Sequence, residues 1–321
     1  MDKLYIGVDL GGTNIAAGIV NQKGEILFKK TIKTHLPQPE SVIEKKICLL
    51  CDELCKENGL VLGKDVNFIG IGSPGNVDVD TGVVGFNVNF GYIDWHLKEK
   101  IQNQFCNIAV SVENDANCAI IAEVMAGCAK GCRHAAILTL GTGVGAGVIV
   151  DGKVLHGYNQ SAAEIGHMVI SAGGRQCNCG RKGCFERYCS ATALIEDTKN
   201  AMAANKNSKI WEVCEDIELV TAKTVFDASE KGDKTAKEII DNYINYLACG
   251  VVNVVNIFQP EVLCLGGGVA NQGEVLLKPI REYLDREDYA RHLAKRVKIK
   301  TAELKNDAGI IGAAMLGVYN A

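Results

Sequence analysis

Two glycine-rich hairpin patterns, one in each half of the chain, constrain the possible folds more than any other feature. The first, IGVDLGGTNIAAGIVNQKGEILFKK, predicts an apolar strand, a glycine turn, a second strand, a polar turn and a third strand. The second, ILTLGTGVGAGVIVDGKVLHG, repeats that order. The repetition favours two structurally related halves, although glycine-rich hairpins can also resemble each other by chance.

The segments between and after these hairpins alternate between strand and helix patterns. Strand-like runs such as VNFIGIG, IAVSVE and EVLCLGGG alternate with helical runs such as NCAIIAEVMAG and TAKEIIDNYINYLACGVVNVVNIF. This alternation predicts an α/β fold with mainly parallel sheets. A further helix is predicted over SVIEKKICLLCDELCKENG, with Ser41 as its cap and Cys48, Cys51 and Cys55 on its apolar stripe.

Composition excludes several classes of partner. The net charge of -4 and pI near 5.9 supply no basic field for nucleic acid or an anionic membrane, so we expect neither, and a small ligand fits better. The stretch MDKLYIGVDLGGT lacks the basic and apolar regions of a secretory leader, and no run reaches the about 18 to 20 apolar residues of a membrane span. We therefore expect a cytoplasmic protein whose 14 cysteines are thiols.

One phosphate-binding pattern is discounted. The sequence GIGSPG, residues 70–75, matches G-x-G-x-x-G, but Pro74 and the turn-rich GNVDVDTG that follows offer no helix to bind a pyrophosphate. We interpret it as a loop. The P-loop pattern G-x-x-x-x-G-K-[ST] does not occur in the sequence.

Two acidic motifs suit phosphoryl transfer. In DLGGT, Asp9 ends a strand and is followed by two glycines and the hydroxyl of Thr13, which suits magnesium-nucleotide binding, though an ordinary hairpin turn also explains it. In ENDAN, Asn114 or Asp115 can cap the helix that follows. A carboxylate at this strand-to-helix corner can also accept a hydroxyl proton, so Asp115 is the candidate catalytic base.

A third motif predicts a metal site. His167, Cys177, Cys179 and Cys184 make a Cys₃His set, the closed ligand number of structural zinc, within a glycine-rich loop that spans residues 167–184. Free thiols or a redox pair are the alternatives. A loop fixed by zinc would hold Glu164 and Glu186 toward a polar ligand, and the second imidazole nitrogen of His167 would be available to it.

Together, DLGGT, GIGSPG, ENDAN, LGTGVGAG, EIGHM, CNCGRKGCFE and LGGGV span nearly the whole chain. In this order they resemble the ROK family of bacterial sugar kinases and repressors, and most closely its glucokinases. The resemblance implies a duplicated actin-like ATPase fold of the ribonuclease H-like type, with two lobes around a central cleft. It also implies ATP with Mg²⁺ as donor, a hexose as acceptor, structural Zn²⁺, and a homodimer.

The resemblance assigns roles to individual residues. ATP phosphates and Mg²⁺ would be bound at Asp9, Gly11, Gly12, Thr13, Thr142 and Gly143, and the adenosine at Gly266 and Gly267. The sugar hydroxyls would be bound by Asn89, Asn114, Asp115, Glu164, His167 and Glu186, with Gly75 close to the ring. Similar glucokinases often carry a tryptophan shortly after the asparagine that matches Asn89, whereas this chain has Tyr92 there, so the sugar preference stays open.

The alternatives are an N-acetylmannosamine kinase or another hexose kinase, a sugar-sensing repressor, and a non-catalytic sugar or nucleotide sensor. The repressors of the family carry a helix-turn-helix segment, for which the first hairpin, beginning by Leu4, leaves no room. The expected lobes are residues 1–115 with 303–321 and residues 116–302.

Overall fold

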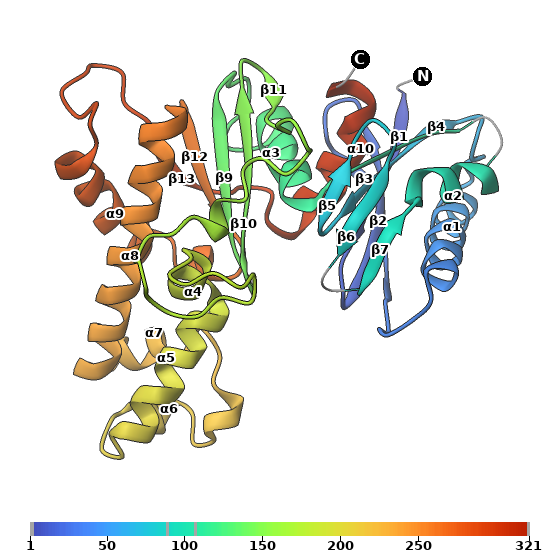
Figure 1. Ribbon diagram of the computed structural model, residues 1–321. Helices are drawn as coiled ribbons and strands as arrows, with labels where there is room; N and C mark the ends of the chain where they lie inside the picture. The colour runs from blue at the N-terminus through green and yellow to red at the C-terminus, as the bar shows by residue number, and fades with distance from the viewer. Residues whose placement is uncertain (1–2, 88–89, 106–107, 320–321) are drawn as a thin grey trace. The chain divides into compact units, whose positions relative to one another are not determined.

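The computed structural model describes residues 3–87, 90–105 and 108–319, which form two compact units (Figure 1). Unit 1 comprises Met1–Ile137, Gly147–Ala163 and Ala302–Ala321, and unit 2 comprises Leu138–Ala146 and Glu164–Thr301. The lobe limits expected from the sequence stay a prediction.

The first hairpin pattern forms the centre of a five-stranded sheet in the order β3-β2-β1-β4-β8. As predicted, β1, β2 and β3 form an antiparallel meander, while β4 and β8 extend the sheet parallel to β1. The strands are β1 (Leu4–Leu10), β2 (Asn14–Asn21), β3 (Ile26–Lys33), β4 (Val66–Ser73) and β8 (Ala109–Asn114). A small antiparallel sheet consists of β5 (Asn76–Asp78), β6 (Val83–Asn87) and β7 (Tyr92–Trp95).

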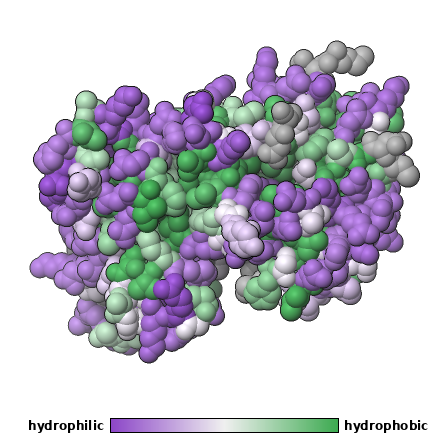
Figure 2. Space-filling model, turned by 45° about the horizontal axis from the view of Figure 1, so that its top comes forward, coloured by the Kyte–Doolittle hydropathy of each residue, from purple (hydrophilic) through white to green (hydrophobic). Residues whose placement is uncertain are grey.

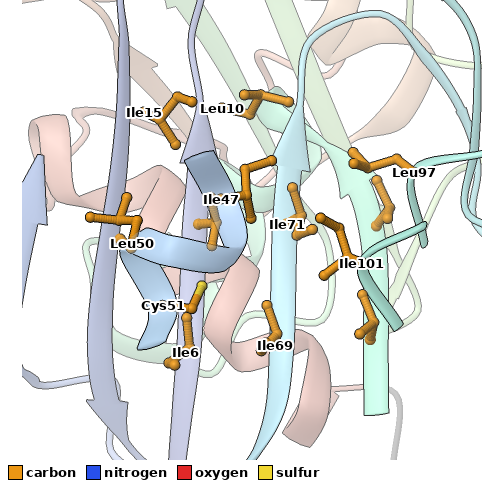
Figure 3. Close-up of a cluster of buried hydrophobic side chains, with 14 of the residues drawn as sticks. Ile6, Leu10, Ile15, Ile47, Leu50, Cys51, Ile69, Ile71, Leu97 and Ile101 are labelled. Carbon is orange, nitrogen blue, oxygen red and sulfur yellow. The ribbon is translucent and has the colours of Figure 1, made fainter. Parts of the chain in front are cut away.

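Helices cover both faces of this sheet. On one face, α1 (Glu40–Glu57) buries Ile47, Leu50 and Cys51 against Ile6 and neighbouring strand residues (Figure 3). Beside α1 on this face, α2 (Leu97–Gln104) lies next to β8 and adds Leu97 and Ile101 to the same cluster. On the other face, α10 (Ala308–Tyr319) and α3 (Asp115–Ala126) pack together. Close approach is possible because β1 carries a glycine at Gly7, where a Cβ atom would lie 1.9 Å from the carbonyl oxygen of Ile310.

The predicted start of α1 was wrong by a small margin. Pro39, in an extended conformation, occupies the N-cap position, and no side chain caps the helix. Ser41 instead lies within the first turn. Proline fits here because its missing N–H is one of those that the first helical turn leaves without an intrahelical partner.

The second hairpin pattern forms another five-stranded sheet, in the order β11-β10-β9-β12-β13. In both sheets the strands therefore run third, second, first, fourth, fifth in chain order, as expected of duplicated halves. The expectation of mainly parallel sheets was wrong, since each sheet is mixed. The strands are β9 (Ala135–Leu140), β10 (Val144–Val150), β11 (Lys153–Val154), β12 (Val262–Gly266) and β13 (Lys298–Thr301).

The remaining elements are mostly helices of unit 2. They are η1 (Ile165–His167), α4 (Glu186–Cys189), α5 (Ala191–Ala204), α6 (Ile210–Val213), η2 (Ile217–Leu219), α7 (Thr224–Glu230), α8 (Lys234–Phe258), η3 (Val269–Gln272) and α9 (Glu274–Glu287), with η4 (Lys305–Asp307) in unit 1. Among the described residues, none of the helices has the length and apolar character needed to cross a membrane. Hydrophilic side chains cover most of the face seen in Figure 2, interrupted by patches of hydrophobic ones.

Candidate functional site

In unit 1, β1 and β8, which lie on either side of β4, bring acidic side chains to one edge of the sheet. The parallel register pairs Asp9 of β1 with Gly72 of β4, and Gly72 with Glu113 of β8. Asp115 begins α3 directly after β8. The carboxyl ends of parallel strands are where open α/β sheets bind ligands, so this edge is the candidate site of unit 1.

Asp9 is held in a confined position. The turn that follows is closed by a hydrogen bond from Gly11 N–H to the carbonyl of Asn14 (2.9 Å), and Thr34 Oγ1 donates to the carbonyl of Gly11 (2.7 Å). Gly309 lies against the carboxylate, because a Cβ atom there would be 2.7 Å from Asp9 Cγ. Burial raises the pKa of Asp9, and the positive charge of Lys29 only partly offsets this. A carboxylate that is costly to bury in this way favours a bound cation beside it.

The corner between β8 and α3 forms as the sequence predicts. The side chain of Asn114 caps α3 by accepting hydrogen bonds from Ala116 N–H (2.9 Å) and Asn117 N–H (3.2 Å). Its amide also donates to the carbonyl of Gly75 (3.1 Å). Asp115, the first residue of the helix, is exposed. Asn114, Asp115 and Gly75 therefore lie together at this edge, with Asp115 open to solvent.

The turn after β4 fits closely against the small sheet. The GIGSPG segment is not wholly a loop, since β4 continues to Ser73, but no helix follows it, in agreement with the rejection of a dinucleotide site. Gly75 has a φ of 99°, and a Cβ atom there would lie 2.3 Å from the carbonyl oxygen of Phe86. Asn87, which follows Phe86 in β6, donates through Nδ2 to the carbonyl of Pro74 (2.6 Å) and also holds the turn.

The structure describes only one of the two residues on which the sugar preference was argued, Asn89 and Tyr92. Asn89 lies outside the described residues. Tyr92 is buried, and its hydroxyl donates to the carbonyl of Gln38. Trp95 is fully buried beside it and donates through Nε1 to Glu44 (2.8 Å). Both aromatic residues thus pack the core next to α1.

In unit 2, the second glycine turn meets Glu186. The carboxylate of Glu186 accepts a hydrogen bond from Val144 N–H (3.0 Å), and a Cβ atom on Gly143 would lie 2.3 Å from Glu186 Oε2. Thr142 is tied to α5, because its carbonyl accepts from Thr192 Oγ1 (2.7 Å). The turn expected to bind phosphate and a carboxylate expected to bind sugar are therefore direct neighbours.

Two further segments approach this turn. Glu164 is exposed and precedes η1, and Gly166 allows η1 to lie against β10, since a Cβ atom there would be 2.1 Å from the carbonyl oxygen of Val144. At the end of β12, Gly266 is buried and Gly267 has a φ of 81°. A Cβ atom on Gly267 would lie 2.5 Å from the carbonyl oxygen of Leu140, so only glycine fits.

The predicted zinc ligands gather in unit 2. One ligand atom from each of His167, Cys177, Cys179 and Cys184 lies within 4.8 Å of the others. The Cys177 sulfur is 3.7 Å from His167 Nδ1, and the sulfurs of Cys179 and Cys184 are 3.6 Å apart. Burial raises the pKa of Cys184 to about 12, with a further contribution from the neighbouring thiols. Three sulfurs and one imidazole nitrogen fit tetrahedral zinc, whose charge would keep the thiolates deprotonated.

Sequence reasoning missed three residues of these sites. Gly309 was not considered, His156 was treated only as part of a hairpin, and Glu113 was noted in ENDAN without a role. Glu113 is buried, and its carboxylate lies 2.8 Å from His156 Nε2. The weak signal for Glu113 was an acidic residue at the end of an apolar strand.

Comparison with known proteins gives a consistent picture. The model of the ROK family matches residues 5–318 of the chain. The chain is 37% identical to a glucokinase of Halalkalibacterium halodurans over 98% of this chain and 95% of that protein. It is 36% identical to a glucokinase of Thermotoga maritima over 98% of both. A crystal structure of a ROK family glucokinase from Streptomyces griseus in complex with glucose and AMPPNP is 32% identical, with a TM-score of 0.82 and 98% of both chains covered.

Proposed function

Because the chain belongs to the ROK family, we propose that it transfers the γ-phosphoryl group of ATP to a hexose, with glucose as the acceptor. The observation that carries this function is the placement of Asp9 and Asp115 at one edge of the unit 1 sheet, through the register of β1, β4 and β8. The relatives named glucokinase support the acceptor, and the relative crystallised with glucose and AMPPNP supports the donor.

The turn after β1 would bind the nucleotide's phosphates. Gly11 and Gly12 shape the turn, and the N–H of Gly12 and the hydroxyl of Thr13 would supply donors, since the N–H of Gly11 already closes the turn. The half-buried carboxylate of Asp9 and its raised pKa fit a site for Mg²⁺. Magnesium at that place would neutralise charge on the phosphates. Thr142 and Gly143 of the second turn are assigned to the phosphates, and Gly266 and Gly267 to the adenosine.

Asp115 would act on the acceptor hydroxyl. Its position at the start of α3 and its exposure leave the carboxylate open to a sugar, while Asn114 is fixed beside it as the helix cap. We assign to Asp115 the orientation of the 6-hydroxyl and the acceptance of its proton. Since phosphoryl transfer passes through a loose transition state, the proton moves late, and positioning is the larger part of this role.

Unit 2 would recognise other hydroxyls of the sugar. We assign this to Glu164, Glu186 and His167, whose carboxylates and free imidazole nitrogen can form hydrogen bonds with hydroxyls. The hydrogen bond from Val144 N–H fixes one oxygen of Glu186 and leaves the other for a ligand. Zinc in the cluster of Cys177, Cys179, Cys184 and His167 Nδ1 would orient the imidazole, so that Nε2 is presented to the sugar.

The test is hexose-dependent ADP release by the purified protein with MgATP. Glucose, N-acetylmannosamine, mannose and fructose are compared, and turnover is expected to be fastest with glucose. Asp115→Asn should lower kcat at least about 100-fold while an ATP analogue still binds. Asp94→Asn, which changes an exposed aspartate of unit 1, is the matched control. No sugar-dependent turnover would reject the function, and turnover confined to another hexose would reject glucose as the acceptor.

A cytoplasmic location, a homodimer and the absence of a nucleic acid partner stay predictions from the sequence. Gel filtration with light scattering would test the dimer.

A further inference from the structure

A buried carboxylate lies directly behind the candidate catalytic corner. The side chain of Glu113 is only 4% exposed. Its Oε1 accepts hydrogen bonds from Asn114 N–H (2.8 Å) and from Asn117 Nδ2 (2.9 Å), so it binds both ends of the first turn of α3. Its Oε2 lies 2.8 Å from His156 Nε2. Burial of a carboxylate is costly unless hydrogen bonds or an ion pair compensate for the lost water, so Glu113 depends on these partners.

His156 belongs to a loop that is fixed to the same region of unit 1. The carbonyl of His156 accepts a hydrogen bond from Ala162 N–H (3.0 Å), which closes the loop on itself. Asn76 Nδ2, next to Gly75, donates to the carbonyl of Gln160 (3.2 Å). The imidazole therefore approaches Glu113 from a loop that is closed on itself and held by the side chain of Asn76.

We propose that Glu113 and His156 are positioning residues for phosphoryl transfer. The imidazolium of His156 fixes the Glu113 carboxylate, and this carboxylate fixes the first turn of α3, which carries Asn114 and Asp115. The inference rests on the proposed function, because it assigns a role to residues that hold the proposed base. Neither residue is assigned a contact with the substrate.

The charges around His156 make this role depend on pH. The hydrogen bond with Glu113 raises the pKa of His156, burial opposes this, and the negative charge of Asp80 adds to the increase. Tyr319 of α10 also lies near Glu113, but burial raises its pKa to about 12, so it stays neutral. A raised histidine pKa means that the ion pair is fully formed at low pH and is lost as the pH rises through that pKa. Neutral His156 still donates a hydrogen bond, which is weaker than the charged one.

The experiment compares kcat of the wild type and His156→Gln from about pH 6 to about pH 9, the range in which a histidine with a raised pKa titrates. Glutamine keeps a donor but never carries the charge. We expect kcat of the variant to be about tenfold lower at the acidic end, with an unchanged KM for ATP, and the two enzymes to converge at the alkaline end. His96→Gln is the matched control, because it removes an exposed histidine that lies 3.6 Å from Asp94 in the same unit.

A second measurement does not depend on activity. Titration of the His156 imidazole by NMR should give a pKa above the usual value of about 6.5 in the wild type, and a lower one in Glu113→Gln. A ratio of kcat values that does not change with pH, or an imidazole pKa that is the same in both proteins, would overturn the positioning role. Absence of hexose-dependent turnover in the wild type would instead reject the proposed function, and the positioning role with it, while NMR still reports the pair.

Discussion

Replacement of Gly309 by alanine should separate activity from stability. The new Cβ atom would lie 2.7 Å from Asp9 Cγ, whereas ordinary contacts begin at 3.4 Å, so the carboxylate must retreat by about 0.7 Å. This movement is possible because the atoms in the way belong to a side chain. Alanine also favours the helical conformation of α10 by about 0.5–1 kcal/mol relative to glycine. We therefore expect an unchanged or slightly higher melting temperature, with kcat reduced about tenfold or more because Asp9 is displaced.

Gly312→Ala in the same helix is the control with the opposite expectation. Its Cβ atom would lie 1.8 Å from the carbonyl oxygen of Cys118 in α3, and a backbone atom cannot move aside alone. This variant should lose about 1–3 kcal/mol of unfolding free energy. The assays are thermal unfolding and ADP release over a range of Mg²⁺ concentrations. Suppose that Asp9→Ala is inactive but Gly309→Ala has the kcat and the Mg²⁺ dependence of the wild type. This result would refute the idea that the contact with Gly309 fixes the Asp9 carboxylate.

Three other predictions concern metal, pH and an aromatic residue. Metal analysis should find one zinc per chain. Cys184→Ser should lose the zinc and melt at least about 5 °C below the wild type, whereas the control Cys214→Ser should keep it. Equal melting temperatures of the two variants would contradict a structural zinc site. Asp233 caps α8. Burial raises the pKa of Asp233, but hydrogen bonds from backbone N–H groups and a serine hydroxyl outweigh this and lower the pKa overall. The contribution of Asp233 to stability is therefore present above the usual aspartate pKa and is lost as the pH falls through the lowered pKa of the folded protein. Asp233→Ala should therefore cost about 1–2 kcal/mol at pH 7 in denaturant unfolding and progressively less as the pH falls below the usual aspartate pKa of 3.8, and a cost that does not change with pH would contradict this. Tyr92→Phe removes the hydrogen bond to Gln38 and should cost about 1 kcal/mol with an unchanged KM for glucose; a changed KM would give Tyr92 a direct role in sugar binding.

Local patterns in the sequence predicted most elements of the fold, because their causes lie within a few residues. The glycine turns defined both hairpins, and Asn114 caps α3 as the polar corner in ENDAN suggested. Two expectations failed for physical reasons. The helix α1 begins earlier than expected because Pro39 fits the N-cap position. The sheets are mixed because each contains an antiparallel hairpin, to which strands later in the chain are added in parallel.

The site was only partly predictable. Motifs identified Asp9, the cysteine cluster and Asp115 because each is recognisable within its own short segment. The residues that hold these groups are distant in sequence: His156 is 43 residues from Glu113, and Gly309 reaches Asp9 from the C-terminal helix. No local periodicity records such a contact, so a single sequence contains no direct sign of it.

The return of α10 to the first sheet has a consequence for synthesis of the protein. Unit 1 contains β1 near the start of the chain and α10 near its end, with the whole of unit 2 translated between them. While the ribosome is still producing residues 164–301, the sheet face beneath α10 has no cover from its own helix. Unit 2 is thus able to fold before unit 1 is finished, and the apolar face that waits for α10 is exposed to aggregation during that time.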